Sequence, residues 1–153
     1  MSFLENEIFV RGLMSLLGVS GFFVARLISN HKIKKRPLVC PAGFDCHAVV
    51  HSDYSKFLNI RVEVLGMLYY ALIAISYFIS IFFSGSLPDI FVALVAVSSL
   101  GAFVFSGYLI WVQIFVLKKG CSWCFVSASI SVAIFVLTVY AQDLGLITQV
   151  FLK

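Results

Sequence analysis

Long apolar stretches alternate with short polar ones along the chain, and four of the apolar stretches are long enough to cross a membrane as helices. They cover about residues 8–28, 64–83, 90–117 and 121–141. The hydrocarbon core of a bilayer requires about 20 mostly apolar residues in a helix. The pattern therefore predicts an all-α membrane protein, a four-transmembrane-helix bundle in which residues 1–153 form one domain.

The third stretch has small residues at four-residue spacing, Ser98, Ala102 and Ser106. Small side chains in membrane helices allow two backbones to approach closely. We therefore expect this face of the third helix to pack against a neighbouring helix.

Residues 29–63, between the first two spans, form the one sizeable polar segment and contain all three histidines. In its second half, from Ala48 to Leu58, apolar residues recur at near-helical spacing. This pattern predicts a short helix that lies in the membrane interface with its apolar side toward the bundle.

Composition supports a membrane protein and excludes several functions. The chain is 61% hydrophobic and 12% charged, with a mean hydropathy of +1.06, too apolar for a soluble domain of this size. The net charge of +4 comes from short clusters, so there is no extended basic face for nucleic acid. The four spans contain no His, Asp or Glu, which argues against a bis-histidine haem and against proton-coupled transport.

The chemistry of the chain resides in four cysteines, which form two pairs, Cys40 with Cys46 and Cys121 with Cys124. Two predicted spans separate the pairs, so both pairs face the same side of the membrane. This layout is typical of a dithiol relay embedded in a membrane.

The second pair begins the fourth predicted helix, directly after Lys118 and Lys119. A helix N-terminus and nearby ammonium groups both favour thiolate over thiol, which makes the sulfurs nucleophilic. We expect Cys124 to point into the bundle and Cys121, the more exposed sulfur, to face the loop. A structural disulfide or one side of a metal site remains an alternative.

The first pair encloses five residues, so a disulfide across it would constrain little of the unfolded chain. A relay role explains Cys40 and Cys46 better than a stabilising role. Four cysteines can also bind zinc, although this gap is wider than in usual zinc knuckles. The prediction is that no metal is bound.

The electron acceptor has to come from outside the chain, and a lipid-soluble quinone is suitable. It needs an apolar pocket between helices, a few hydrogen-bond donors at the rim and a thiolate nearby. The candidate donors are Ser52, Ser55, Tyr69, Tyr70 and Ser127, with His47 and His51 as further possibilities.

These residues resemble a known family. The motifs are Cys40-x5-Cys46, Ser52, Tyr54-Ser55-Lys56, Gly66, Tyr69-Tyr70 and Cys121-x2-Cys124. Over about residues 8–141, the chain resembles the vitamin K epoxide reductase family, whose bacterial members are thiol oxidases that pass electrons from protein dithiols to a quinone.

The resemblance implies a role for each cysteine. Cys124 is the thiolate that reacts with the quinone, with Cys121 as its disulfide partner. Cys46 attacks that disulfide through a Cys46–Cys121 intermediate, and Cys40 exchanges disulfides with a thioredoxin-like protein. Ser52 matches the family serine near the quinone. The implied function is a quinone-dependent protein-disulfide oxidoreductase that supports disulfide bond formation.

The chain departs from the family at three places. Asn59-Ile60-Arg61 stands where the family often has Gly-x-Pro, and Asn tolerates a left-handed turn. Ala128 stands where animal members carry a tyrosine, which favours a plain quinone such as ubiquinone or menaquinone over vitamin K epoxide. Many bacterial members continue into a thioredoxin-like domain, whereas this chain ends at Lys153, so we expect a separate thioredoxin-like partner.

The charge pattern and the resemblance predict opposite orientations. Most basic residues lie on the cysteine side: Arg26, Lys32, Lys34, Lys35, Arg36, Lys56, Arg61, Lys118 and Lys119. The positive-inside rule places that side in the cytoplasm, whereas family members usually expose it outside the cytoplasm, where disulfides persist. Two other functions also remain open: a reductase that recycles a quinone or its epoxide, and a small membrane adaptor with structural disulfides or zinc.

Overall fold

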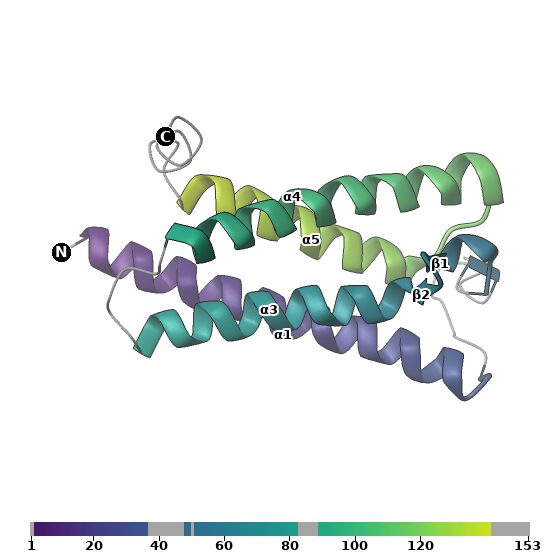
Figure 1. Ribbon diagram of the computed structural model, residues 1–153, viewed down its shortest axis with the longest axis horizontal. Coiled ribbons are helices and arrows are strands. Elements are labelled where there is room, and N and C mark those ends of the chain that lie inside the picture. Colours follow the sequence, from purple (N-terminus) through teal and green to yellow (C-terminus); the bar gives the residue numbers. More distant parts are fainter. Residues whose placement is uncertain (1, 37–47, 50, 83–88, 142–153) are drawn as a thin grey trace.

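The computed structural model describes residues 2–36, 48–49, 51–82 and 89–141, and its four long helices run roughly along one axis (Figure 1). They are α1 (Ser2–Ile33), α3 (Val62–Phe82), α4 (Asp89–Trp111) and α5 (Ser122–Ala141). Within the described residues, four helical segments are long and apolar enough to cross a membrane. The predicted all-α bundle is confirmed, and the protein is an integral membrane protein.

The outside of the bundle is apolar and its interior holds many hydroxyl groups. Large apolar side chains such as Phe9, Phe82 and Ile90 are well exposed, as expected where lipid rather than water surrounds the helices. The buried polar residues include Ser76, Ser80, Ser99, Ser131 and Thr138. Ser99 and Ser131 bond across helices, to Tyr69 and Tyr70, whereas Ser76 and Ser80 donate to carbonyls of their own helix.

Helices α1 and α3 pack closely along their length because α1 presents two glycines to α3. A Cβ atom at Gly18 would lie 2.8 Å from the backbone nitrogen of Ala74, and one at Gly21 would overlap the ring of Tyr70. Helix α5 packs on both α1 and α4, whereas α3 and α4 make few contacts with each other. The bundle is therefore open between α3 and α4.

The segment before α3 differs from the prediction. Residues 48 and 49 are helical, but Asp53–Ser55 form a single 3-10 turn, η2, and β1 (Lys56–Phe57) pairs antiparallel with β2 (Ile60–Arg61). The helix predicted through Leu58 is therefore wrong in its second half. The hairpin turn requires positive φ at both central residues, and Leu58 has a φ of 52° and Asn59 a φ of 65°. Asn59 thus adopts the left-handed conformation that asparagine tolerates.

The third span also changes geometry at its end. After Trp111 the chain continues as a π-helix, η3 (Val112–Leu117). This helix ends at Lys118, which has a left-handed φ of 52°. The backbone N–H groups of Lys118 and Lys119 both donate to the carbonyl of Gln113. A wide last turn closed by a left-handed residue ends the helix, and the chain turns back into α5.

Candidate functional site

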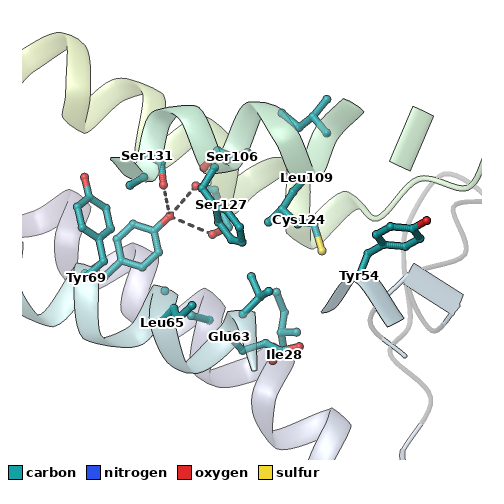
Figure 2. Close-up of a pocket in the computed structure, with 18 of the residues that line it drawn as sticks. Ile28, Tyr54, Glu63, Leu65, Tyr69, Ser106, Leu109, Cys124, Ser127 and Ser131 are labelled. Carbon is teal, nitrogen blue, oxygen red and sulfur yellow. Dashed lines mark hydrogen bonds between the residues drawn. The ribbon is translucent and has the colours of Figure 1, made fainter. Parts of the chain in front are cut away.

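A cavity of about 450 Å³ lies among α3, α4 and α5 at the end of the bundle that carries the hairpin (Figure 2). Most of its lining is apolar, and its size suits a small organic molecule. The lining residues Leu68 of α3 and Gly101 of α4 are exposed on the surface of the bundle, Leu68 by 65%. The cavity therefore opens sideways between these two helices, toward lipid.

The small residues of α4 form part of this opening. Ser98, Ala102 and Ser106 all line the cavity, on the side where α4 and α3 remain apart. The expected close helix contact is therefore not made between α3 and α4, and the small side chains leave space for a molecule instead. The hairpin covers the same region, because Phe57 of β1 packs edge-on against Phe105 of α4 with ring centroids 5.4 Å apart.

Both cysteines of the Cys-x-x-Cys pair are free thiols, and they occupy different environments. Cys121 lies directly before α5, has 0% exposure and packs against Ile28 and Val49. Cys124, in the first turn of α5, is half-buried and lines the cavity (Figure 2). The structure thus reverses the expected order of exposure, because Val49, from the segment between α1 and α3, packs over Cys121.

The two cysteines are in direct contact. The backbone N–H of Cys124 donates to the Cys121 sulfur at 3.3 Å. A hydrogen bond from the Cys124 thiol is the main cause that lowers the pKa of Cys121; backbone N–H groups of Cys124 and Trp123 also lower it, against the opposing effect of burial. Cys121 is therefore the sulfur of the pair that is better suited to be the thiolate.

Gln113 fixes the backbone of this pair. Gln113 is buried, with only 4% of the residue exposed. Its Oε1 accepts a 3.1 Å hydrogen bond from the backbone N–H of Cys121. The π-helical turn places Gln113 beside the start of α5, in the cavity wall. The sequence analysis missed this residue, although a lone glutamine in an apolar span was a usable signal.

Tyr70 connects α3 to α5. Its hydroxyl lies 2.6 Å from the carbonyl oxygen of Ser127, 3.0 Å from Ser127 Oγ and 2.7 Å from Ser131 Oγ. The dashed lines to Ser127 and Ser131 in Figure 2 mark these hydrogen bonds. Tyr70 and Ser127 do line the cavity, as predicted for ligand donors. However, these bonds use the hydrogen-bonding capacity of the Tyr70 hydroxyl within the bundle, and so indicate a structural role.

Two other predicted donors also line the cavity and have partners in the protein. Ser52 donates to the carbonyl of Val49 at 2.7 Å, and Tyr69 donates to Ser99 Oγ at 3.3 Å. Several predicted site residues lie outside the described part of the chain: Cys40, Cys46, His47 and the side chain of Ser55. The described residues therefore leave the first cysteine pair untested.

A buried ion pair, which the sequence analysis missed, lies in the same region. Lys32 Nζ of α1 is 3.1 Å from Oε1 of Glu63, with side-chain exposures of 11% and 7%. Glu63 falls in the predicted polar segment, but α3 begins at Val62, so the carboxylate lies in the first turn of that helix. The expectation that the second span lacks an acidic residue is therefore wrong at its first turn.

Among the described residues, no three His, Cys, Asp or Glu side chains come together as a metal site would require. A zinc site made by both cysteine pairs would need Cys40 and Cys46, which lie outside that part of the chain.

A four-helix membrane bundle with a Cys-x-x-Cys at an apolar cavity defines a class of membrane thiol oxidoreductases. Comparison with protein families gives a match to the vitamin K epoxide reductase family over residues 12–139. This covers most of the chain, so the protein belongs to that family, whose members are oxidoreductases. A comparison with individually curated proteins gives no match.

Proposed function

We propose that the protein is a quinone-dependent thiol oxidase. It takes electrons from the dithiol of a separate thioredoxin-like protein, passes them through Cys40 and Cys46 and then Cys121 and Cys124, and delivers them to a membrane quinone. The net result supports disulfide bond formation. The observation that carries this proposal is the position of Cys124 in the wall of an apolar cavity that opens toward lipid, in contact with a buried partner cysteine.

The cavity is suitable for a quinone ring. Its walls are mostly apolar, a few polar side chains such as Gln113 and Ser106 are interspersed, and it can be reached from the bilayer, where quinones dissolve. Ala128, at the position of the animal tyrosine, also lines it. Because a methyl group offers no hydroxyl to an epoxide, we propose a plain quinone such as ubiquinone or menaquinone as the acceptor.

When bound there, a quinone supplies the capacity to accept two electrons and two protons. Cys124 and Cys121 lose their thiol hydrogens and form one S–S bond, which releases two electrons and two protons. Cys124 is the sulfur placed to react first because it faces the cavity. Cys121, whose pKa is lowered, is placed to close the disulfide as a thiolate.

The reduced state is restored from the loop side. Cys46 attacks the Cys121 sulfur of the Cys121–Cys124 disulfide, and Cys40 then displaces Cys121 to form the Cys40–Cys46 disulfide, which oxidises the partner protein. Val49 packs against Cys121 and is three residues after Cys46. Three residues span at most about 10 Å, which supports an exchange between Cys46 and Cys121.

For the orientation we propose that the cysteine side is extracytoplasmic, because disulfides persist there. The exposed basic residues Lys34, Lys35 and Arg36 lie at the same end and favour the opposite orientation. A membrane-impermeant thiol reagent applied to intact cells distinguishes the two. Labelling without lysis supports the extracytoplasmic orientation, and labelling only after lysis contradicts it.

Steady-state quinone reduction by the purified protein tests the relay. The wild type, Cys124→Ser and Cys40→Ser are compared with a small dithiol and with a protein dithiol as reductant. We expect Cys124→Ser to abolish turnover with both reductants. Cys40→Ser should affect the protein dithiol more, because a small thiol can reach the inner pair directly. Equal loss with both reductants in Cys40→Ser would contradict a shuttle role for that cysteine.

A further inference from the structure

We infer that Glu63 takes up the proton released by Cys124 and passes it to the quinone bound in the cavity; this inference rests on the proposed quinone reduction. Between turnovers, Lys32 stabilises the Glu63 carboxylate. Within the described lining of the cavity, Glu63 is the one carboxylate. Glu63 takes no part in the thiol–disulfide exchange of the proposed relay.

The hydrogen bonding of Glu63 is incomplete. Oε1 is paired with Lys32, whereas Oε2 is buried and has no hydrogen-bond partner among the described residues. The residue as a whole is 8% exposed. An unpartnered buried carboxylate oxygen is costly and rare in folded proteins. An unpartnered Oε2 is explained if this oxygen binds a proton during turnover, while the proton moves from the Cys124 sulfur to the quinone.

Glu63 also faces the same cavity as the reacting sulfur. Glu63 and Cys124 line the same cavity, from the first turn of α3 and the first turn of α5 (Figure 2). The other groups of the cavity wall that could carry the proton, the hydroxyls of Tyr70 and Tyr69, are less suitable because they already bond to serines within the bundle.

Proton balance shows why such a carrier is needed. Hydrogen bonding lowers the pKa of Cys121, which favours a reduced pair with one thiolate and one proton on Cys124. When the S–S bond forms, the Cys124 S–H bond breaks and two electrons pass to the quinone. The Cys124 proton goes to Glu63 and then to one quinone oxygen. The second proton, released earlier by Cys121, comes from water to the other oxygen, and the carboxylate returns to Lys32.

The test is the single-turnover rate of quinone reduction by fully reduced protein, measured for wild type, Glu63→Gln and Glu63→Asp. Glutamine preserves shape and polarity but cannot carry the proton. Since general acid–base groups contribute about 10²–10⁴-fold, we expect Glu63→Gln to slow the quinone step at least about 100-fold. Glu63→Asp should retain much of the rate. Asp53→Asn, which removes an exposed carboxylate of η2, is the matched control and should behave as wild type.

Glu63→Gln leaves Lys32 without its carboxylate, so a stability loss has to be separated from lost proton transfer. The double variant Lys32→Met with Glu63→Gln removes both charges and restores a neutral interior. We expect the folded double variant to remain slow with quinone, while reduction of its Cys121–Cys124 disulfide by a small dithiol proceeds at the wild-type rate. A quinone rate within about twofold of wild type, in either variant, would overturn the role of Glu63.

This outcome is distinct from failure of the proposed function. If wild-type protein does not reduce quinone at all, the thiol-oxidase proposal fails and the inference about Glu63 fails with it. If wild type reduces quinone and the Glu63 variants do so equally well, only the proton-carrier inference is wrong.

Discussion

The side-chain Oε1 of Gln113 accepts a hydrogen bond from the backbone N–H of Cys121 at 3.1 Å and so joins η3 to the residue that directly precedes α5. The contact exists because the π-helical turn of η3 brings Gln113, eight residues earlier in the chain, beside the cysteine. It holds the first cysteine of the pair in place without involving its sulfur. The reactive pair therefore depends on the backbone geometry of two helices.

Replacement of Gln113 by Ala should loosen this pair. The buried N–H of Cys121 loses its acceptor, at a cost of about 1–3 kcal/mol. We expect faster alkylation of Cys121 and slower quinone turnover, measured by mass spectrometry of labelled protein and by quinone absorbance. Ile114→Ala, at an exposed neighbouring position, is the control. Unchanged alkylation in Gln113→Ala would show that the hydrogen bond does not position Cys121.

The titration of Cys121 should depend on a hydrogen-bond donor at position 124. The Cys124 thiol is the largest cause that lowers the pKa of Cys121, so the Cys121 thiolate should persist to lower pH than that of an unperturbed cysteine. Cys124→Ala removes the donor and should raise the midpoint of the titration, followed by thiolate absorbance. Cys124→Ser keeps a hydroxyl donor and should raise it less. Identical midpoints in the two variants would contradict the hydrogen-bond explanation.

Tyr70→Phe tests whether the hydroxyl of Tyr70 is structural. Its removal leaves Ser127 and Ser131 without their shared partner between α3 and α5. We expect the free energy of unfolding to fall by about 1–3 kcal/mol, with little change in KM for quinone. Thermal unfolding in detergent and steady-state kinetics measure the two effects. A raised KM at unchanged stability would instead assign the hydroxyl to quinone binding.

Two glycines of α1 form a matched pair for the packing of α1 against α3. A methyl group at Gly21 would overlap the Tyr70 ring, whereas one at Gly12 would have nothing within 4 Å. Gly21→Ala should therefore destabilise the protein by about 1–3 kcal/mol, as overpacking usually does. Gly12→Ala should be neutral or stabilising by up to about 1 kcal/mol, because alanine favours the helix. Equal stabilities would contradict the close contact.

Features that depend on local pattern could be predicted from the sequence. The four spans follow from the lengths of their apolar stretches. Asparagine at position 59 is compatible with the positive φ found there, but its tolerance alone does not predict a turn. The hairpin of Lys56–Phe57 with Ile60–Arg61 was missed because the apolar spacing of this short segment fits a helix equally well.

Features that depend on contacts between distant segments could not be predicted. Lys32 and Glu63 are 31 residues apart, and Gln113 meets Cys121 only because the π-helical turn η3 follows α4. The burial of Cys121 depends on Val49, a residue of another segment. Such pairs depend on how helices pack and end, and hydropathy along the chain does not encode this.

The most direct test of the thiol-to-quinone relay is a single turnover without external thiols. Fully reduced protein is mixed anaerobically with quinone, and the products are measured by quinone absorbance and by mass spectrometry of alkylated cysteines. We predict that quinone loss is matched by a Cys121–Cys124 disulfide in wild type and that neither product appears in Cys124→Ser. Quinone reduction that persists in Cys124→Ser, or wild-type protein that keeps both thiols, would contradict the proposed function.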